Sequence, residues 1–206
     1  MRDDIECYWL ALAELARNMP FSSIAEVAEI LFACHEQDGT VFVLGNGGSA
    51  ATASHFACDL AKGTQTPGVT PFRVMPLTDN MPLLTAWAND TSYERVFAEQ
   101  LKTLVRPGDV VLVISVSGNS PNVLHAVDTA NAMGAMTIAL AGESGGEVGK
   151  LAALTLRVPG GSIEQVEDAH SAITHSLCVA LRERLRSRAE LPQWANSEPF
   201  VLELEP

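Results

Sequence analysis

The sequence predicts an α/β fold: a three-layer α/β/α sandwich on a five-stranded parallel sheet, with additional helices at the N-terminus. Short apolar runs alternate along the chain with longer segments whose apolar residues recur at helical spacing. This alternation is typical of a parallel sheet that is covered by helices on both faces. The 206 residues, 47% of them hydrophobic and 18% charged, suit one globular domain with a substantial core.

Each element follows from a local pattern. The clearest strand is Val110-Val111-Leu112-Val113-Ile114, because a continuous apolar run of this length indicates a buried parallel strand. Pro20 ends the first helix, and Pro121 suits the first turn of a later one. The expected strands cover residues 41–44, 72–76, 110–114, 136–141 and 154–158. The expected helices cover residues 3–17, 22–36, 49–62, 80–88, 92–104, 121–133, 146–152 and 162–188.

The chain is expected to contain one domain and a tail. Residues 1–188 would form the domain with its helical N-terminal extension. Residues 189–206 contain Pro192, Pro199 and Pro206 and are expected to be extended, since proline interrupts helices.

Composition limits the classes of partner. The net charge of -12 gives a surface that repels phosphate backbones, so nucleic-acid binding is not expected. Acidic residues stand at the N-terminus where a signal peptide would be basic, and no apolar run reaches the roughly 18 residues of a membrane span. The cysteines are scattered without a C-x-x-C pair, which is typical of reduced thiols. We therefore expect a cytoplasmic protein without membrane contact.

Two polar loops each follow a predicted strand and open a predicted helix. In Gly45-Asn46-Gly47-Gly48-Ser49-Ala50, glycines let the backbone approach an anion, the helix N-terminus offers N–H groups and Ser49 adds a hydroxyl. Ser115-Val116-Ser117-Gly118-Asn119-Ser120 offers further hydroxyls. The first loop has neither the lysine of a P-loop nor the dinucleotide glycine spacing. One such loop can be an ordinary turn, but two at the carboxyl ends of parallel strands predict an anion site.

Two predicted helices carry candidate metal ligands. His55 and Asp59 are four residues apart on one helix face, and Glu167 and His175 share a face of the last helix. A histidine and a carboxylate from each helix can ligate a divalent metal such as Zn²⁺. Spacing alone favours the alternative, two solvated helix faces with incidental histidines. Asn89 and Asp90 are expected in a loop between helices, where they either contact sugar hydroxyls or cap a helix.

Taken together, these residues resemble a sugar isomerase (SIS) domain and, within it, the phosphoheptose isomerase family. The resemblance covers about residues 5–186. It is carried by the loop 45–50, Thr85-Ala86-Trp87-Ala88-Asn89-Asp90, Pro107-Gly108-Asp109, residues 115–122 and the helix around 167–175.

The resemblance implies the SIS fold and a homotetramer with active sites between subunits. It implies an aldose–ketose isomerase that converts sedoheptulose 7-phosphate to a D-glycero-heptose 7-phosphate. One Zn²⁺ per subunit would be held by His55, Asp59, Glu167 and His175. The phosphate would meet the loop of Ser115, Val116, Ser117 and Ser120. Other substrate contacts would fall on Asn46, Gly47, Gly48, Asn89, Asp90 and Glu167.

The chain departs from the family pattern at three of these positions. Asp59 stands where the family has Glu, Glu167 where it has Gln, and Val116 where it has Thr. Two histidines and two carboxylates remain a sound ligand set for a divalent metal. A metal is therefore expected together with a somewhat different substrate or geometry.

The expected mechanism moves a proton between C1 and C2 of the sugar through an enediol. Asp59 is the candidate base and His175 its acid partner, with the metal polarising the oxygens. If the metal holds Asp59, Glu167 is the alternative base. Two other classes stay open: a non-catalytic tetrameric SIS adaptor that binds a replication initiator, and a sensor that binds a sugar phosphate without turnover.

Overall fold

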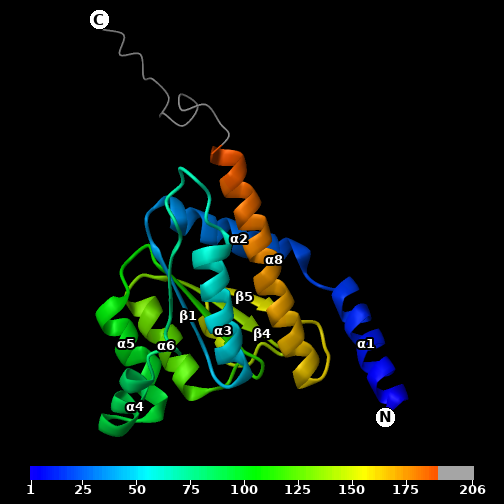
Figure 1. Cartoon of the computed structure of the whole chain (residues 1–206). Helices are drawn as coiled ribbons and strands as arrows, with labels where there is room; N and C mark the ends of the chain where they lie inside the picture. Colours follow the sequence, from blue (N-terminus) through cyan, green and yellow to red (C-terminus); the bar gives the residue numbers. More distant parts are fainter. Residues whose placement is uncertain (190–206) are drawn as a thin grey trace, which may run out of the picture.

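A parallel sheet of five strands forms the centre of the protein, as the sequence predicts (Figure 1). In this computed structural model, which describes residues 1–189, the strands lie in the order β2-β1-β3-β4-β5. Their bounds are β1 Thr40–Gly45, β2 Arg73–Pro76, β3 Val110–Ser115, β4 Met136–Ala141 and β5 Leu154–Arg157. The tail expected from residue 189 onward lies outside the described residues, apart from Ala189.

Helices follow the strands in the predicted places. Their bounds are α1 Arg2–Arg17, α2 Phe21–Glu36, α3 Gly48–Cys58, α4 Met81–Asp90, α5 Val96–Leu104, α6 Pro121–Ala132, α7 Val148–Leu151 and α8 Ile163–Ala189. The segment predicted as one helix over 49–62 changes at Asp59 into a π-helical turn, Asp59–Gly63. A short 3-10 turn, Tyr93–Arg95, precedes α5. Within residues 1–189, no helix is long and apolar enough to cross a membrane.

Two separate hydrophobic cores lie on the two faces of the sheet. Alternate residues of β1 point to opposite faces: Val41 and Val43 join one core, whereas Phe42 and Leu44 join the other. The first core also contains buried residues of α2, α3 and α8, and the second contains those of α5, α6 and α7. This confirms the three-layer architecture. α3 and α8 lie side by side over the first face (Figure 1).

The strand order changes direction between β1 and β3. From β1 the chain continues to β2 on one side, and then returns to place β3 on the other side. The crevice at the carboxyl ends of two such strands is the usual ligand site of an open α/β sheet. The loops 45–50 and 115–120 leave the sheet there, because Gly45 pairs with Ile114 at the end of the β1–β3 ladder.

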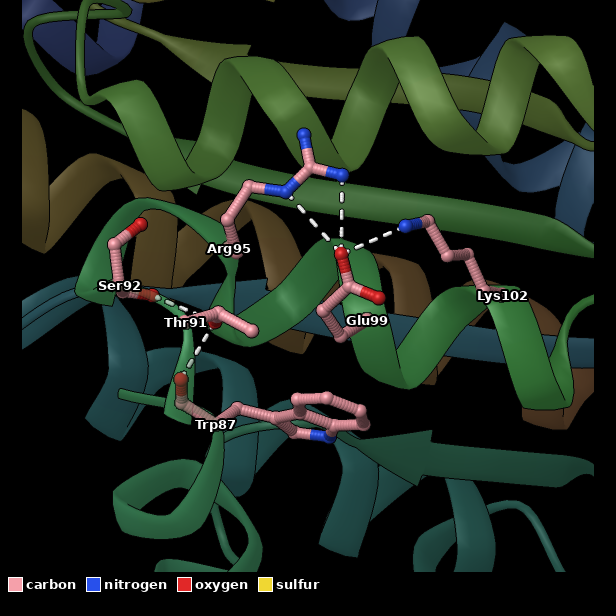
Figure 2. Close-up of polar contacts among 6 residues, drawn as sticks. All are labelled: Trp87, Thr91, Ser92, Arg95, Glu99 and Lys102. Atoms are coloured by element: carbon pink, nitrogen blue, oxygen red, sulfur yellow. Dashed lines mark hydrogen bonds and ion pairs between the residues drawn. The ribbon is translucent and has the colours of Figure 1, made fainter. Parts of the chain in front are cut away.

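The expectation that Asn89 and Asp90 lie in a loop is wrong, because both belong to the last turn of α4. Figure 2 shows how this turn is closed: the Thr91 hydroxyl donates to the carbonyl oxygen of Trp87 at 2.6 Å. The backbone N–H of Thr91 donates to the same oxygen at 2.9 Å, so the helix ends only after Asp90.

The start of α5 is held by a charge cluster (Figure 2). Glu99 Oε1 accepts from Lys102 Nζ at 2.7 Å and from Arg95 Nη2 at 3.0 Å. These hydrogen bonds hold the pKa of Glu99 below its usual range, and the one from Lys102 has the largest effect. Because Arg95 belongs to the 3-10 turn and Glu99 to α5, their contact ties this turn to the helix.

His170 of α8 is fully buried, and among the described residues neither of its ring nitrogens has a hydrogen-bond partner of normal geometry. Burial lowers its pKa to about 4, although the nearby Ala141 carbonyl opposes the shift in part. The imidazole is therefore neutral in the folded protein at physiological pH.

We expect this histidine to make stability depend on pH. The unfolded chain takes up the proton near pH 6.5 and the folded chain only near pH 4. The free energy of unfolding should thus fall by about 3 kcal/mol as the pH drops through that window, and stay unaffected above it. Urea unfolding at several pH values checks this. In His170→Met, the free energy of unfolding should change less with pH between 6.5 and 4 than in the wild type. The half-buried His125→Gln is the control, and an equal slope in wild type and His170→Met would contradict the prediction.

Candidate functional site

A cavity of about 330 Å³, lined by both polar and apolar side chains, lies at the carboxyl ends of β1 and β3. Both predicted loops and the first turns of α8 line it. The lining residues are Asn46, Ser49, Ile114, Ser115, Val116, Ser117, Ser120, Ile163 and Glu167. No lysine or arginine of the described residues is among them, so hydroxyl and N–H groups must supply the contacts to any bound anion.

Two of the three serine hydroxyls of the second loop are oriented by the backbone. Ser115 Oγ accepts from the N–H of Gly118 at 3.2 Å, and Ser117 Oγ accepts from the N–H of Asn119 at 3.2 Å. Since each oxygen already accepts a hydrogen bond, each hydroxyl proton is available to a ligand. This arrangement suits a phosphate group that is held without a cation.

Glycines allow the second loop to pack closely on the loop after β4. Gly118 has φ +64°, and a Cβ atom there would lie 2.2 Å from the carbonyl oxygen of Gly145. The carbonyl oxygen of Gly118 accepts from the N–H of Val148 at 2.8 Å, and Asn119 Oδ1 accepts from the N–H of Glu147 at 2.9 Å. The loop is therefore shaped by contacts that only glycine permits at position 118.

A pair of asparagines joins the two loops. Asn46 and Asn122 exchange side-chain amide hydrogen bonds in both directions, each of 2.8 Å. The Tyr93 hydroxyl also donates to Asn46 Oδ1 at 3.1 Å. Asn122 is buried in the first turn of α6, where its amide has few alternatives. The pair fixes the first loop relative to the second.

We expect Asn122→Ala to loosen this junction. Losing the buried pair should lower the free energy of unfolding by about 1–3 kcal/mol, because the Asn46 amide loses its main partner. The KM for a sugar phosphate should rise more than kcat falls, since the loops position the phosphate. Urea unfolding and steady-state kinetics measure both effects. Asn131→Ala removes side-chain hydrogen bonds far from the cavity and is the matched control; an unchanged KM in Asn122→Ala would refute the positioning role.

The candidate metal ligands gather where α3 meets α8. Within the described part of the chain, ligand atoms of His55, Asp59 and His175 all lie within 4.8 Å of one another. Asp59 Oδ2 is 3.5 Å from His55 Nε2 and 3.6 Å from His175 Nε2. The two imidazole rings meet edge to face with centroids 4.9 Å apart. Two imidazoles and a carboxylate that converge on one point are a donor set that suits Zn²⁺.

The π-helical turn helps to place the cluster. Asp59 is its first residue, and its carboxylate is about one-third exposed, facing α8. Burial raises the pKa of the neighbouring Cys178 to about 12, and the Asp59 charge adds to this shift.

Glu167 does not join these three residues, although the sequence proposes it as the fourth ligand. Its carboxylate lies against Gly48 at the start of α3, where a Cβ atom on Gly48 would stand 2.6 Å from Glu167 Oε1. It lines the cavity instead. α8 therefore contacts the segment 48–59 at two separate places. Glu167 lies against Gly48, and His175, two helical turns further along α8, lies near Asp59.

The other predicted substrate residues divide into three groups. The cavity brings together Asn46, Ser49, Ser115, Val116, Ser117, Ser120 and Glu167. Asn89 and Asp90 are exposed at the end of α4, bonded to each other at 2.9 Å, and do not line it. Gly47 has φ +55°, with open space where a Cβ would stand. Its role is therefore to let the backbone adopt the positive φ that leads into α3.

Sequence reasoning missed Asn122, Tyr93 and Ile163. Asn122 carries a usable signal, because a polar residue directly after Ser120-Pro121 in a buried helix start needs a partner. Tyr93 and Ile163 carry none, since each approaches the site through the tertiary fold.

Comparison with known proteins identifies the family. The SIS domain family model matches residues 9–142. The phosphoheptose isomerase of Rhodospirillum rubrum is 39% identical over 165 residues, which cover 80% of this chain and 87% of that protein. The chain belongs to the phosphoheptose isomerase family. The phosphoheptose isomerase of Aquifex aeolicus is 36% identical, with 81% of this chain and 86% of that protein covered.

Solved structures of phosphoheptose isomerases share the fold. That of Neisseria gonorrhoeae superposes with a TM-score of 0.82 at 29% identity, over 88% of this chain and 98% of its own. That of Francisella tularensis gives a TM-score of 0.81 at 32% identity, over 88% and 96%. This agreement confirms the SIS fold and the assignment of the chain as an isomerase.

Proposed function

We propose that the protein interconverts sedoheptulose 7-phosphate and a D-glycero-heptose 7-phosphate. The observation that carries the proposal is the pairing of two sites along α3 and α8: a cavity lined by hydroxyls and, beside it, the cluster of His55, Asp59 and His175. The cavity suits the phosphate, and the cluster supplies the acid–base groups that an aldose–ketose isomerisation needs. Membership of the phosphoheptose isomerase family supports the same substrate.

The phosphate positions the sugar. The hydroxyls of Ser115, Ser117 and Ser120 and the N–H groups around them bind it, and Asn46 with Ser49 borders the sugar side of the cavity. Val116 adds an apolar side chain to the lining of the cavity. Its carbonyl oxygen accepts from the N–H of Gly142 at 3.0 Å, which ties the loop to the loop after β4. Asn89 and Asp90, at the end of α4, reach a sugar only if α4 or a neighbouring subunit moves toward it.

Proton transfer falls to the α3–α8 cluster. Asp59 takes the proton from one carbon and returns it to the next, while His175 serves the adjacent oxygen as acid and then as base. The two groups lie 3.6 Å apart, so both can act on neighbouring atoms of one substrate. If a metal holds Asp59, Glu167 is the alternative base.

A divalent metal, of which zinc is our choice, fits this cluster. His55, Asp59 and His175 would hold it, since two imidazoles and one carboxylate are a common ligand set of Zn²⁺ in enzymes. When bound, such an ion polarises a carbonyl or hydroxyl oxygen. Glu167 would need to leave Gly48 to become a fourth ligand.

We further propose a homotetramer, with α1 in the subunit contact. Ile5, Trp9 and Leu10 of α1 are 59–65% exposed, an unusual set of large apolar side chains for a surface. α1 is nevertheless fixed on its own subunit, because the Tyr8 hydroxyl donates to Asp168 Oδ2 of α8 at 2.6 Å. We also propose that the protein is cytoplasmic, because its proposed substrate is a phosphorylated sugar.

The test is to incubate the zinc-loaded protein with sedoheptulose 7-phosphate and follow the products by NMR. A new aldose 7-phosphate that depends on enzyme concentration supports the proposal. Binding of the sugar phosphate with no product would indicate a sensor, and neither binding nor turnover would indicate an adaptor. Sedimentation of the same sample gives the subunit number.

A further inference from the structure

Glu167 occupies an unexpected place for an acidic residue. Its carboxylate lines the cavity that Ser115, Ser117 and Ser120 prepare for an anion. It also lies over the N-terminal residue of α3, where a Cβ atom on Gly48 would be 2.6 Å from one carboxylate oxygen and 2.9 Å from the other. The half-buried carboxylate thus fills part of the space that a helix N-terminus offers to an external anion.

A phosphate and this carboxylate oppose each other in one cavity. Charges of like sign a few ångströms apart repel strongly where solvent is partly excluded, and no basic side chain of the described residues lines the cavity to offset the repulsion. Binding of a sugar phosphate is therefore favoured by any event that removes the Glu167 charge from the cavity.

The contact of α3 with α8 provides such an event. Along it, Gly48 faces Glu167, then Thr52 faces Ser171 with 3.4 Å between their hydroxyl oxygens, and then Asp59 faces His175. Glu167 and His175 are separated by two turns, about 12 Å along the α8 axis. A cation held by His55, Asp59 and His175 would attract the Glu167 carboxylate away from Gly48 and toward the cluster.

We propose that Glu167 couples metal binding to phosphate binding. Without a metal its carboxylate stays beside Gly48 and weakens the binding of a phosphate. With a divalent cation on the three-residue cluster the carboxylate turns toward the cation, and the hydroxyl-lined cavity accepts the phosphate. The inference rests on the proposed function, because it takes the cavity as the phosphate site and the cluster as the metal site.

Calorimetric titration of the full chain tests the coupling without turnover. The probe is sorbitol 6-phosphate, a sugar-alcohol phosphate that lacks the carbonyl and cannot isomerise. It is titrated into chelator-treated protein and into the same protein loaded with Zn²⁺. We expect zinc to tighten its binding to the wild type by about 10-fold, within the usual range of coupling between two sites. By the same linkage, the probe should raise the affinity for Zn²⁺ by an equal factor.

Glu167→Gln removes the charge but keeps the side-chain length. In this variant we expect the metal-free protein to bind the probe about as tightly as the zinc-loaded wild type, and zinc to change the affinity less than about 2-fold. Glu183→Gln, an equal change of charge on the exposed part of α8, should behave like the wild type.

The outcomes separate the two proposals. Equal affinity of the wild type with and without zinc overturns the coupling alone. Wild-type coupling that persists in Glu167→Gln also overturns it, because the cation then acts on the phosphate directly. A probe that binds no form of the protein overturns the phosphate cavity itself, and with it the proposed function.

Discussion

Asp59→Asn is expected to lower kcat by about 10²- to 10⁴-fold, the usual loss when a general acid–base group is removed. Asparagine has the same shape as aspartate but cannot accept the proton from the sugar carbon. Asp59 lies within 3.6 Å of both His55 and His175 and is the carboxylate of this three-residue cluster. The affinity of the metal-free protein for the sugar phosphate should change little, because the phosphate cavity is formed by other residues.

Steady-state kinetics, a binding titration and the zinc content of each preparation check this. Asp128→Asn, an exposed residue on the opposite layer, is the matched control and should keep wild-type turnover. His175→Ala should show a loss of the same order as Asp59→Asn. Near-normal kcat in both Asp59→Asn and His175→Ala would refute the assignment of acid and base. If Asp59→Asn loses zinc but keeps its kcat, Asp59 serves only to bind the metal.

Gly118→Ala is expected to lower the free energy of unfolding by about 2–5 kcal/mol. A non-glycine residue at φ +64° costs about 1–2 kcal/mol, and overpacking adds about 1–3 kcal/mol. The overpacking arises because the new methyl group would stand 2.2 Å from the Gly145 carbonyl oxygen, a backbone atom that cannot turn away. The loop that carries Ser115 and Ser117 must shift, so sugar-phosphate affinity should fall as well.

Gly160→Ala separates the two causes. Gly160 has φ +86°. Apart from its own chain neighbours, no atom of residues 1–189 lies within 4 Å of the place where the alanine methyl group would stand, so alanine there carries the backbone strain without the overlap. Urea unfolding should therefore show a loss of about 1–2 kcal/mol for Gly160→Ala, smaller than for Gly118→Ala. Equal losses in the two variants would show that the contact with Gly145 is unimportant.

Much of the fold is readable from the sequence because the local signals agree. The apolar run at 110–114 became β3, and the prolines at 20 and 121 mark helix boundaries where the structure has them. The end of α4 escaped prediction: Thr91 extends the helix by donating to Trp87, and a threonine after Asn-Asp does not distinguish this from a loop.

The site was predictable where one segment determines it, and not where two segments share the space. The serines of the second loop reach the cavity because they follow β3 directly. Glu167 has the helical spacing of a partner for His175, yet its carboxylate lies against Gly48. The direction of a long side chain depends on what the opposite helix leaves open, and helical spacing along α8 contains no information about α3.

The pairing of β1 with β3 also bears on how the protein folds. The two strands are adjacent in the sheet but are separated in sequence by α3, β2, α4 and α5. Closing such a long loop is entropically unfavourable and is slow compared with forming local helices. The two loops of the cavity therefore come together late, and their ligands meet a finished site. A bound sugar phosphate should lengthen the lifetime of the folded state without hastening its formation.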